Sequence, residues 1–174
     1  GAKSSFEEYV ITWRLIQILQ AISALVFFFY PQFYFKNIEK NKNFVIKIQN
    51  LIIFGLIIIS IIILIAKPLL DLIFKYHFNY VVLIVLLLSE IVRLSAGIIN
   101  TKFSFYMKNR VLLYTLSISV IFMFFTWLIL FLYHHALTSL DISLGLLSCF
   151  GIYFISTYLM SMRLGNAKPA LIKD

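Results

Sequence analysis

The chain has 174 residues, of which 62% are hydrophobic and 13% are charged. Soluble globular domains contain about 25% charged residues, so this composition excludes an ordinary soluble domain. The formal net charge is +8, but the lysines and arginines lie mostly in short gaps between apolar runs and form no patch of the kind that binds nucleic acid. We therefore expect an integral membrane protein with no soluble domain and no nucleic-acid partner.

Five apolar segments are long enough to cross a membrane, which takes about 20 residues of helix. The first ends near Pro31, before the polar loop KNIEKNKN, and the second contains LIIFGLIIISIIILIA and stops before Lys67. The third is different because Glu90, Arg93 and Asn100 lie in its interior. The expected fold class is all-α, a polytopic membrane bundle of five transmembrane helices. The spans cover about residues 10–30, 45–66, 80–101, 112–133 and 140–162.

The positively charged residues are divided unequally between the two sides of the expected bundle. Ten lie on one side and three on the other, and the positive-inside rule makes the richer side cytoplasmic. The chain then starts outside and ends in the cytoplasm. Because an external start without an initiating methionine needs either an earlier span or an unusual insertion route, we expect 1–174 to be a fragment of a larger protein. The richer side holds Lys36, Lys40, Lys42, Lys47, Lys102, Lys108, Arg110, Arg163, Lys168 and Lys173, and the other side holds Lys3, Lys67 and Lys75.

Glu90 and Arg93 are the strongest candidates for a functional site. A charged side chain near the middle of a span costs about 2.5–3.5 kcal/mol on insertion scales, so both should face protein or water. At about 100° per residue, they fall on one polar helix face with Asn100. The alternative is a structural ion pair between positions i and i+3. The full face comprises Glu90, Arg93, Gly97, Asn100, Thr101 and Ser104.

A weaker polar face runs along the first span. Arg14, Gln17 and Gln20 share it with the small residues Ala21 and Ala24, and this face and that of the third span would line one cavity. The alternatives are that Arg14 snorkels to the membrane surface and that the glutamines only link helices by hydrogen bonds. The candidate substrate-binding residues are Arg14, Gln17, Gln20, Glu90, Arg93 and Asn100.

Other kinds of chemistry find no support in the sequence. His77, His134 and His135 lie at span ends, and the single cysteine, Cys149, lies in an apolar run. The sequence contains no nucleophile elbow, no glycine-rich phosphate loop and no zinc-binding H-E-x-x-H pair. We therefore expect no metal, no cofactor and no enzymatic activity.

Three segments follow one another in the chain: YVITWRLIQILQAISALVFFFYPQF, AKPLLDLIF and LLLSEIVRLSAGIINTKFSFYMKNR. In this order they resemble the bacterial O-antigen and polysaccharide flippases of the multidrug/oligosaccharidyl-lipid/polysaccharide flippase superfamily. The shared feature is a helix with Arg14 and Gln17 that leads to Tyr30, Pro31 and a basic turn. The loop FKYHFNY departs from the family, which often has a glycine and an acidic residue there. The resemblance implies that 1–174 is a partial C-terminal lobe, with helices eight to twelve of a twelve-helix transporter.

The resemblance also implies a function. Such a flippase moves a polyprenyl-diphosphate-linked oligosaccharide across the bacterial inner membrane, with membrane lipids and the polysaccharide polymerase machinery as further partners. Arg14 and Arg93 would bind phosphate, the amide side chains would contact sugar hydroxyls, and Glu90 would tune Arg93 or exchange protons. Two alternatives remain open: a membrane enzyme that acts on polyprenyl phosphate, and a structural or assembly subunit whose polar faces pack against partner helices.

Overall fold

The computed structural model describes residues 2–105 and 108–164. Within these ranges the chain forms six helices and no strand. They are α1 (Ala2–Asn37), α2 (Lys42–Ile65), α3 (Lys67–Phe74), α4 (Tyr80–Phe105), α5 (Asn109–His134) and α6 (Ser139–Leu164). All except α3 are long and apolar enough to cross a membrane. The expected all-α fold of a multi-pass membrane protein with five spans is therefore confirmed.

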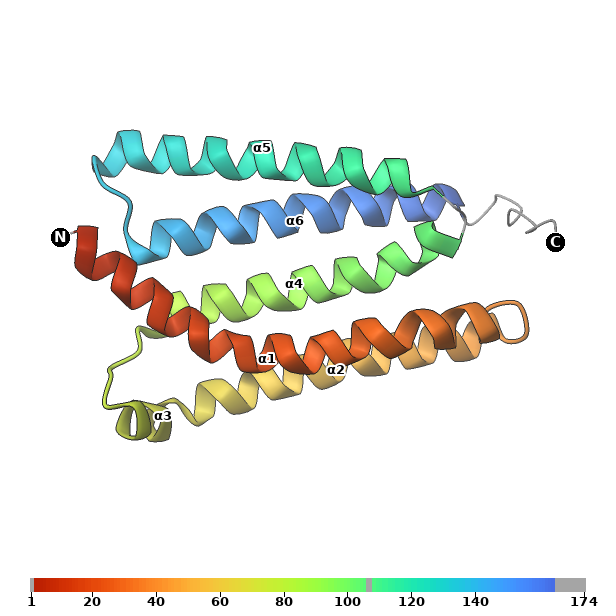
Figure 1. Ribbon diagram of the computed structural model, residues 1–174, viewed down its shortest axis with the longest axis horizontal. Helices are drawn as coiled ribbons and strands as arrows, with labels where there is room; N and C mark the ends of the chain where they lie inside the picture. Colours follow the sequence, from red (N-terminus) through yellow and green to blue (C-terminus); the bar gives the residue numbers. More distant parts are fainter. Residues whose placement is uncertain (1, 106–107, 165–174) are drawn as a thin grey trace.

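Helix α4 lies at the centre of the bundle. It contacts each of the other four long helices, with α6 and α5 on one side of it and α1 and α2 on the other (Figure 1). In its most apolar stretch 61% of the residues are buried, against 11% for α2 and for α5. The central position explains how the one span with an internal ion pair keeps these charges away from lipid.

The main core lies around the contact between α1 and α4. Ile16 and Leu19 of α1 form one cluster with Leu83, Leu86 and Leu94 of α4, and all five side chains are completely buried. Close packing rather than exclusion of water stabilises such a cluster inside a bilayer, because lipid chains are as apolar as leucine. The exposed faces of α2 and α5 carry many large isoleucine, leucine and phenylalanine side chains, which suits contact with lipid.

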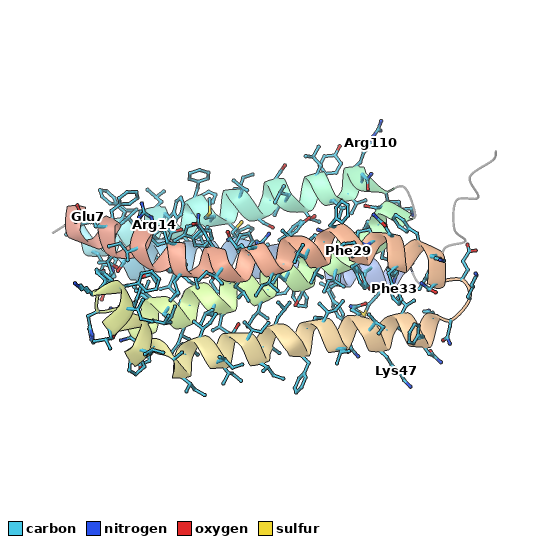
Figure 2. All side chains as sticks on the ribbon, turned by 60° about the horizontal axis from the view of Figure 1, so that its bottom comes forward. Glu7, Arg14, Phe29, Phe33, Lys47 and Arg110 are labelled. Atoms are coloured by element: carbon cyan, nitrogen blue, oxygen red, sulfur yellow. The ribbon has the colours of Figure 1, made fainter. Side chains whose placement is uncertain are left out.

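The two ends of the bundle differ in charge. The start of the chain and α3 lie at one end, and the α1–α2 turn and the α4–α5 connection lie at the other (Figure 1). We call these the α3 end and the basic end. Figure 2 shows Glu7 and Arg14 toward the α3 end, and Lys47 and Arg110 toward the basic end. The helix bounds place Lys36, Lys40, Lys42, Lys47, Lys102, Lys108 and Arg110 at the basic end and Lys67 and Lys75 at the α3 end, whereas Lys168 and Lys173 lie outside the described residues.

The prediction that the first helix ends near Pro31 is wrong, because α1 continues to Asn37. Proline has no backbone N–H to donate to the preceding turn, but Tyr30 and Tyr34 beside it are buried in a cluster with Val45 of α2. This packing holds the helix through the proline. The helix ends six residues after the proline, at Asn37, and beyond the turn Asn41 accepts a hydrogen bond from the Phe44 amide at 3.0 Å and caps α2.

The short helix α3 was not predicted. It begins directly after α2, with a proline in its first turn. Lys67, only 1% exposed, donates a hydrogen bond to Asp71 at 2.5 Å and lies 4.3 Å from the centre of the Tyr80 ring. Asp71 also accepts a hydrogen bond from the Phe78 amide at 3.0 Å. The hydrogen bond from Lys67 lowers the pKa of Asp71, and these contacts anchor α3 to the start of α4.

Candidate functional site

A polar cluster joins α1 to α4 inside the bundle, and we define it as Gln20, Ser23, Glu90 and Arg93. Glu90 is only 1% exposed. Its carboxylate accepts hydrogen bonds from Arg93 Nε at 2.8 Å and Arg93 Nη2 at 2.5 Å. From α1, Gln20 Nε2 donates to the same carboxylate at 3.3 Å, and Ser23 Oγ lies 3.4 Å from it. The buried negative charge is therefore paired within its own helix and solvated by two neutral side chains of the neighbouring helix.

Helical spacing creates both halves of the cluster. Glu90 and Arg93 are three residues apart on α4, as are Gln20 and Ser23 on α1, and residues at this spacing lie on the same helix face. The Ser23 hydroxyl ties the halves together, because it accepts a hydrogen bond from Arg93 Nη2 at 3.3 Å and lies 2.8 Å from the Gln20 carbonyl oxygen. Removing one charge alone would leave the other buried without its counter-charge, which is a costly arrangement.

Phe27 and Gly97 form one wall of the cluster. The guanidinium carbon of Arg93 lies 5.6 Å from the centre of the Phe27 ring, a cation–π distance. A Cβ added to Gly97 would come within 2.2 Å of that ring. The glycine on the predicted polar face of α4 therefore makes room for the aromatic ring that covers Arg93.

Arg93 is the charged member of the cluster that is partly exposed. Its side chain is 30% exposed, whereas that of Glu90 is 1% exposed. Gln20 of the cluster and Phe27, which covers Arg93, lie seven residues apart on one stripe of α1, with the exposed Ala24 between them. Nη1 of Arg93 makes no hydrogen bond with any residue that the structure describes. The guanidinium therefore keeps donors free beside the small-residue face of α1.

Arg14 and Gln17 lie outside the cluster. Both are exposed on α1, and Arg14 lines a separate cavity of about 360 Å³ at the α3 end, together with Lys75 and Tyr76. Six residues of helix separate Arg14 from Gln20, which corresponds to about 9 Å along the axis. The structure thus brings three of the six candidates together, namely Gln20, Glu90 and Arg93, and places Arg14 and Gln17 on an open extension of the same helix.

Asn100, the sixth candidate, connects α4 to α6. Its Nδ2 donates a hydrogen bond to the Tyr153 hydroxyl at 2.8 Å, while its Oδ1 is buried and has no partner within the described chain. It lies seven residues, or about 10 Å, beyond Arg93 toward the basic end. The amide is thus separate from the polar cluster and has one unused acceptor.

The acidic residues near the α3 end have structural contacts. Asp141 accepts hydrogen bonds from the backbone amide of Thr138 at 2.9 Å and from its hydroxyl at 2.8 Å, and His134 Nδ1 lies 3.1 Å away. The Asp141 amide donates back to the Thr138 hydroxyl at 3.2 Å, which completes a capping box at the start of α6. Ser139 bonds Glu8 of α1. Within the described part of the chain, no three histidine, cysteine or acidic residues are placed to hold a metal ion.

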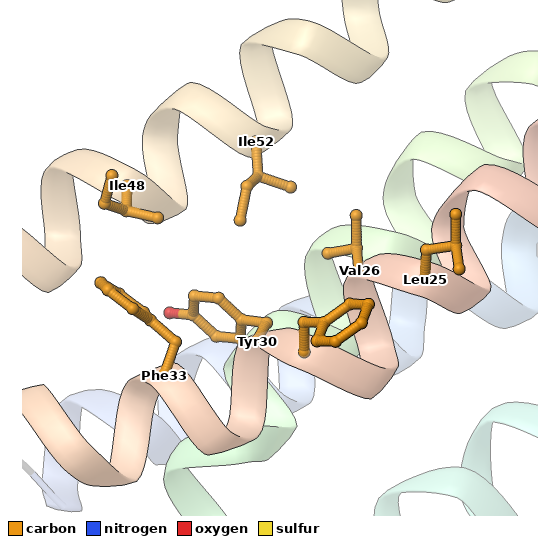
Figure 3. Close-up of a pocket in the computed structure, with 7 residues that line it drawn as sticks. Leu25, Val26, Tyr30, Phe33, Ile48 and Ile52 are labelled. Atoms are coloured by element: carbon orange, nitrogen blue, oxygen red, sulfur yellow. The ribbon is translucent and has the colours of Figure 1, made fainter.

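A second, apolar cavity of about 330 Å³ lies between α1 and α2. Figure 3 shows Tyr30 and Phe33 of α1 across the cavity from Ile48 and Ile52 of α2, with the Tyr30 hydroxyl directed toward the Phe33 ring. This hydroxyl is buried and has no hydrogen-bond partner within the described residues. The lining residues are Leu25, Val26, Phe29, Tyr30, Phe33, Ile48 and Ile52.

Sequence reasoning missed Ser23, Phe27 and Tyr153 as neighbours of the candidate residues. Ser23 could have been found, because it lies three residues after Gln20 and both are polar within an apolar helix. Phe27 carries no such signal among 18 phenylalanines, and only the pairing of α1 with α4 shows its role.

No protein-family model, curated protein or solved structure matches this chain. The class of protein that the fold defines is an α-helical, multi-pass membrane protein with an ion pair inside its third span, hydrogen-bonded to neutral side chains of its first span.

Proposed function

We propose that the chain is part of a flippase that moves a polyprenyl-diphosphate-linked oligosaccharide across the bacterial inner membrane, with its start outside and its end in the cytoplasm. The observation that carries the proposal is the open side of Arg93, which lies beside a polar and small-residue face of α1. The charge distribution between the two ends of the bundle supports the orientation.

The exposed surface of α1 has two different halves. Ile18, Ile22, Leu25 and Phe29 form an apolar half that suits lipid. Arg14, Gln17, Ala21 and Ala24 are also exposed and form the other half. Polar side chains exposed to the bilayer core are costly, and such residues in membrane proteins usually line a pathway or a protein interface. We infer that the polar half faces a water-filled path, whose opposite wall is supplied by another lobe or subunit.

The free donors of Arg93 suit a diphosphate group. Guanidinium is planar and carries five N–H donors, so it can hold a carboxylate along one edge and still donate to a phosphate from its remaining nitrogen. Nε and Nη2 of Arg93 are held by Glu90 and Ser23, so the group is oriented before substrate arrives and Nη1 remains free. Glu90 thus acts as a positioning residue for Arg93. The exposed Gln17 offers an amide to sugar hydroxyls along the same face.

A structural role for the cluster is the second candidate, and one observation favours it. Both carboxylate oxygens of Glu90 already have partners in Arg93, Gln20 and Ser23. In that case the pair would serve only to fix α1 against α4, and a neutral pair would replace it without loss of activity.

Replacing both charges separates the two candidates. Transport per folded molecule is measured for the full-length protein in a flippase-deficient strain, with Glu90→Gln, Arg93→Gln and the double variant. The proposal predicts that each single change lowers transport and that the double variant recovers folded protein but not activity. Ser148→Ala is the matched control, because it removes an interhelical hydrogen bond to Thr126 away from the cluster. Near-normal transport in the double variant would overturn the proposal.

Arg93→Lys tests the chemistry of the same side chain. Lysine keeps the positive charge but has no planar fork, so it cannot bind Glu90 and a phosphate through separate edges. We expect transport to fall at least tenfold, which is roughly the effect of losing one charged hydrogen bond to the substrate. The amount of folded protein should fall much less.

A further inference from the structure

A third cavity lies at the basic end, where α1, α2, α4 and α6 meet. Its volume is about 160 Å³, and its polar lining residues include Lys42 and Gln49 of α2, Lys102 of α4, and Tyr158 and Ser161 of α6. Buried Val45 and Ile98 form part of its apolar lining. This cavity is separate from the polar cluster of Gln20, Ser23, Glu90 and Arg93 and from the candidate residues predicted from sequence.

Two positive charges from different helices converge on this cavity. Lys102 is half-buried and donates one hydrogen bond to the Ser161 carbonyl oxygen at 2.5 Å, which leaves two of its three N–H groups. Lys42 is exposed and makes no side-chain hydrogen bond with the described residues. None of the lining residues is acidic, and Glu39, the nearest acidic residue along the chain, lies exposed on the α1–α2 turn. The mutual repulsion of the two ammonium groups is therefore not balanced within the cavity.

The remaining groups of the cavity add neutral hydrogen-bond donors. The Gln49 amide and the Tyr158 hydroxyl line it, and neither has a side-chain partner in the described part of the chain. Lys42 is the first residue of α2, so the positive end of that helix dipole also lies at the cavity. Two cations, two neutral donors and a helix N-terminus around a space of this size match the requirements of a tetrahedral oxyanion.

We propose that this cavity binds one phosphate group of an anionic lipid headgroup, with Lys42 and Lys102 as the charged donors. The position of the cavity favours a lipid as the source of the phosphate group, because Lys102 lies two residues before the end of the third span, at the depth of lipid headgroups. Basic pockets between transmembrane helices at the lysine-rich side are a known way to hold anionic lipids. The proposal does not depend on the transport function, since its measurements concern lipid binding alone.

The test measures the thermal unfolding of the purified full chain in nanodiscs of phosphatidylcholine with increasing phosphatidylglycerol. We expect phosphatidylglycerol to raise the unfolding temperature of the wild type. Lys42→Gln and Lys102→Met should each weaken the apparent affinity for phosphatidylglycerol about tenfold, because each removes one charged hydrogen bond to the lipid phosphate. Lys47→Gln is the matched control, with the same loss of charge at an exposed position of α2 that does not line the cavity. Equal effects of Lys42→Gln and Lys47→Gln would show only diffuse surface attraction and would overturn the proposal.

Reversal of the charge at Lys42 provides a second test, whose expected result is a gain of stability and not a loss. Lys42→Glu places a carboxylate opposite Lys102, so it should raise the unfolding temperature without anionic lipid and abolish the response to phosphatidylglycerol. Lys47→Glu should do neither. A parallel titration with inorganic phosphate in phosphatidylcholine nanodiscs distinguishes the source: a response only to the lipid supports a headgroup site, and saturation by phosphate at similar concentration overturns the lipid assignment.

Discussion

The ring of Phe27 on α1 occupies the space that a side chain at position 97 on α4 would need. With a Cβ built on Gly97, the nearest ring atom of Phe27 is 2.2 Å away, well inside van der Waals contact. The same ring lies over Arg93. The absence of a side chain at Gly97 thus lets α1 lie close to α4, and it leaves room for the ring that covers the Arg93 guanidinium.

Gly97→Ala should therefore destabilise the bundle by about 1–3 kcal/mol, the usual cost of overpacking a filled interior. Gly151→Ala on α6 is the control, because an added Cβ there meets nothing within 4 Å and alanine favours helix by up to about 1 kcal/mol. Unfolding in mixed detergent micelles measures both. Combining Gly97→Ala with Phe27→Leu should restore part of the loss, and equal stability of the two alanine variants would contradict the packing argument.

Tyr30→Phe should raise the free energy of unfolding by about 1 kcal/mol, because it removes a buried hydroxyl that has no hydrogen-bond partner. Tyr153→Phe provides the opposite case. It deletes the acceptor of the Asn100 amide and should lower the free energy of unfolding by about 1 kcal/mol. Denaturation in one detergent compares the two, and a change of the same sign in both variants would refute the assignment of the Tyr30 hydroxyl as unpaired.

Stability should depend on pH through Asp71. Its pKa is lowered in the folded chain, chiefly by the hydrogen bond from Lys67, relative to an ordinary value of about 3.9. A depressed folded pKa means that the contribution is present above the unfolded pKa and is lost as pH falls through the folded pKa. Asp71→Asn should thus be less stable than wild type at neutral pH, with the difference closing in strong acid. The control, Glu39→Gln on the exposed turn, should change stability little at either pH.

The orientation can be tested with single cysteines. A cysteine at Asn41 or Lys108 should be shielded from an impermeant thiol reagent in intact cells, whereas one at Lys75 should react, because the lysine-rich side is expected to be cytoplasmic. All three positions are exposed. The native cysteine, Cys149, is buried. The Cys149→Ser change in every variant removes any background labelling from it. Labelling of position 41 from outside would reverse the orientation.

Much of the site could be read from the spacing of residues along single helices. Glu90 and Arg93 are three residues apart, and this local geometry is enough to predict that they pair. The interhelical partners of the site were only partly accessible. Gln20 was identified as polar on its helix, but its bond to Glu90 depends on which face of α1 meets α4. Arg14 was expected beside the same cavity and lies instead at the α3 end, because helix length alone separates it from the cluster.

The sequence by itself determined that the protein is helical, crosses a membrane with five spans and divides its charge between two ends. These properties follow from the length, hydropathy and local spacing of segments, and the bilayer requires backbone hydrogen bonds to close within each helix. Only the tertiary structure decided that α4 is central, that α1 continues through Pro31, that α3 is anchored by Lys67 and Asp71, and that Gly97 admits Phe27. These features depend on contacts between residues far apart in the chain, where close packing selects among many apolar faces that look alike in sequence.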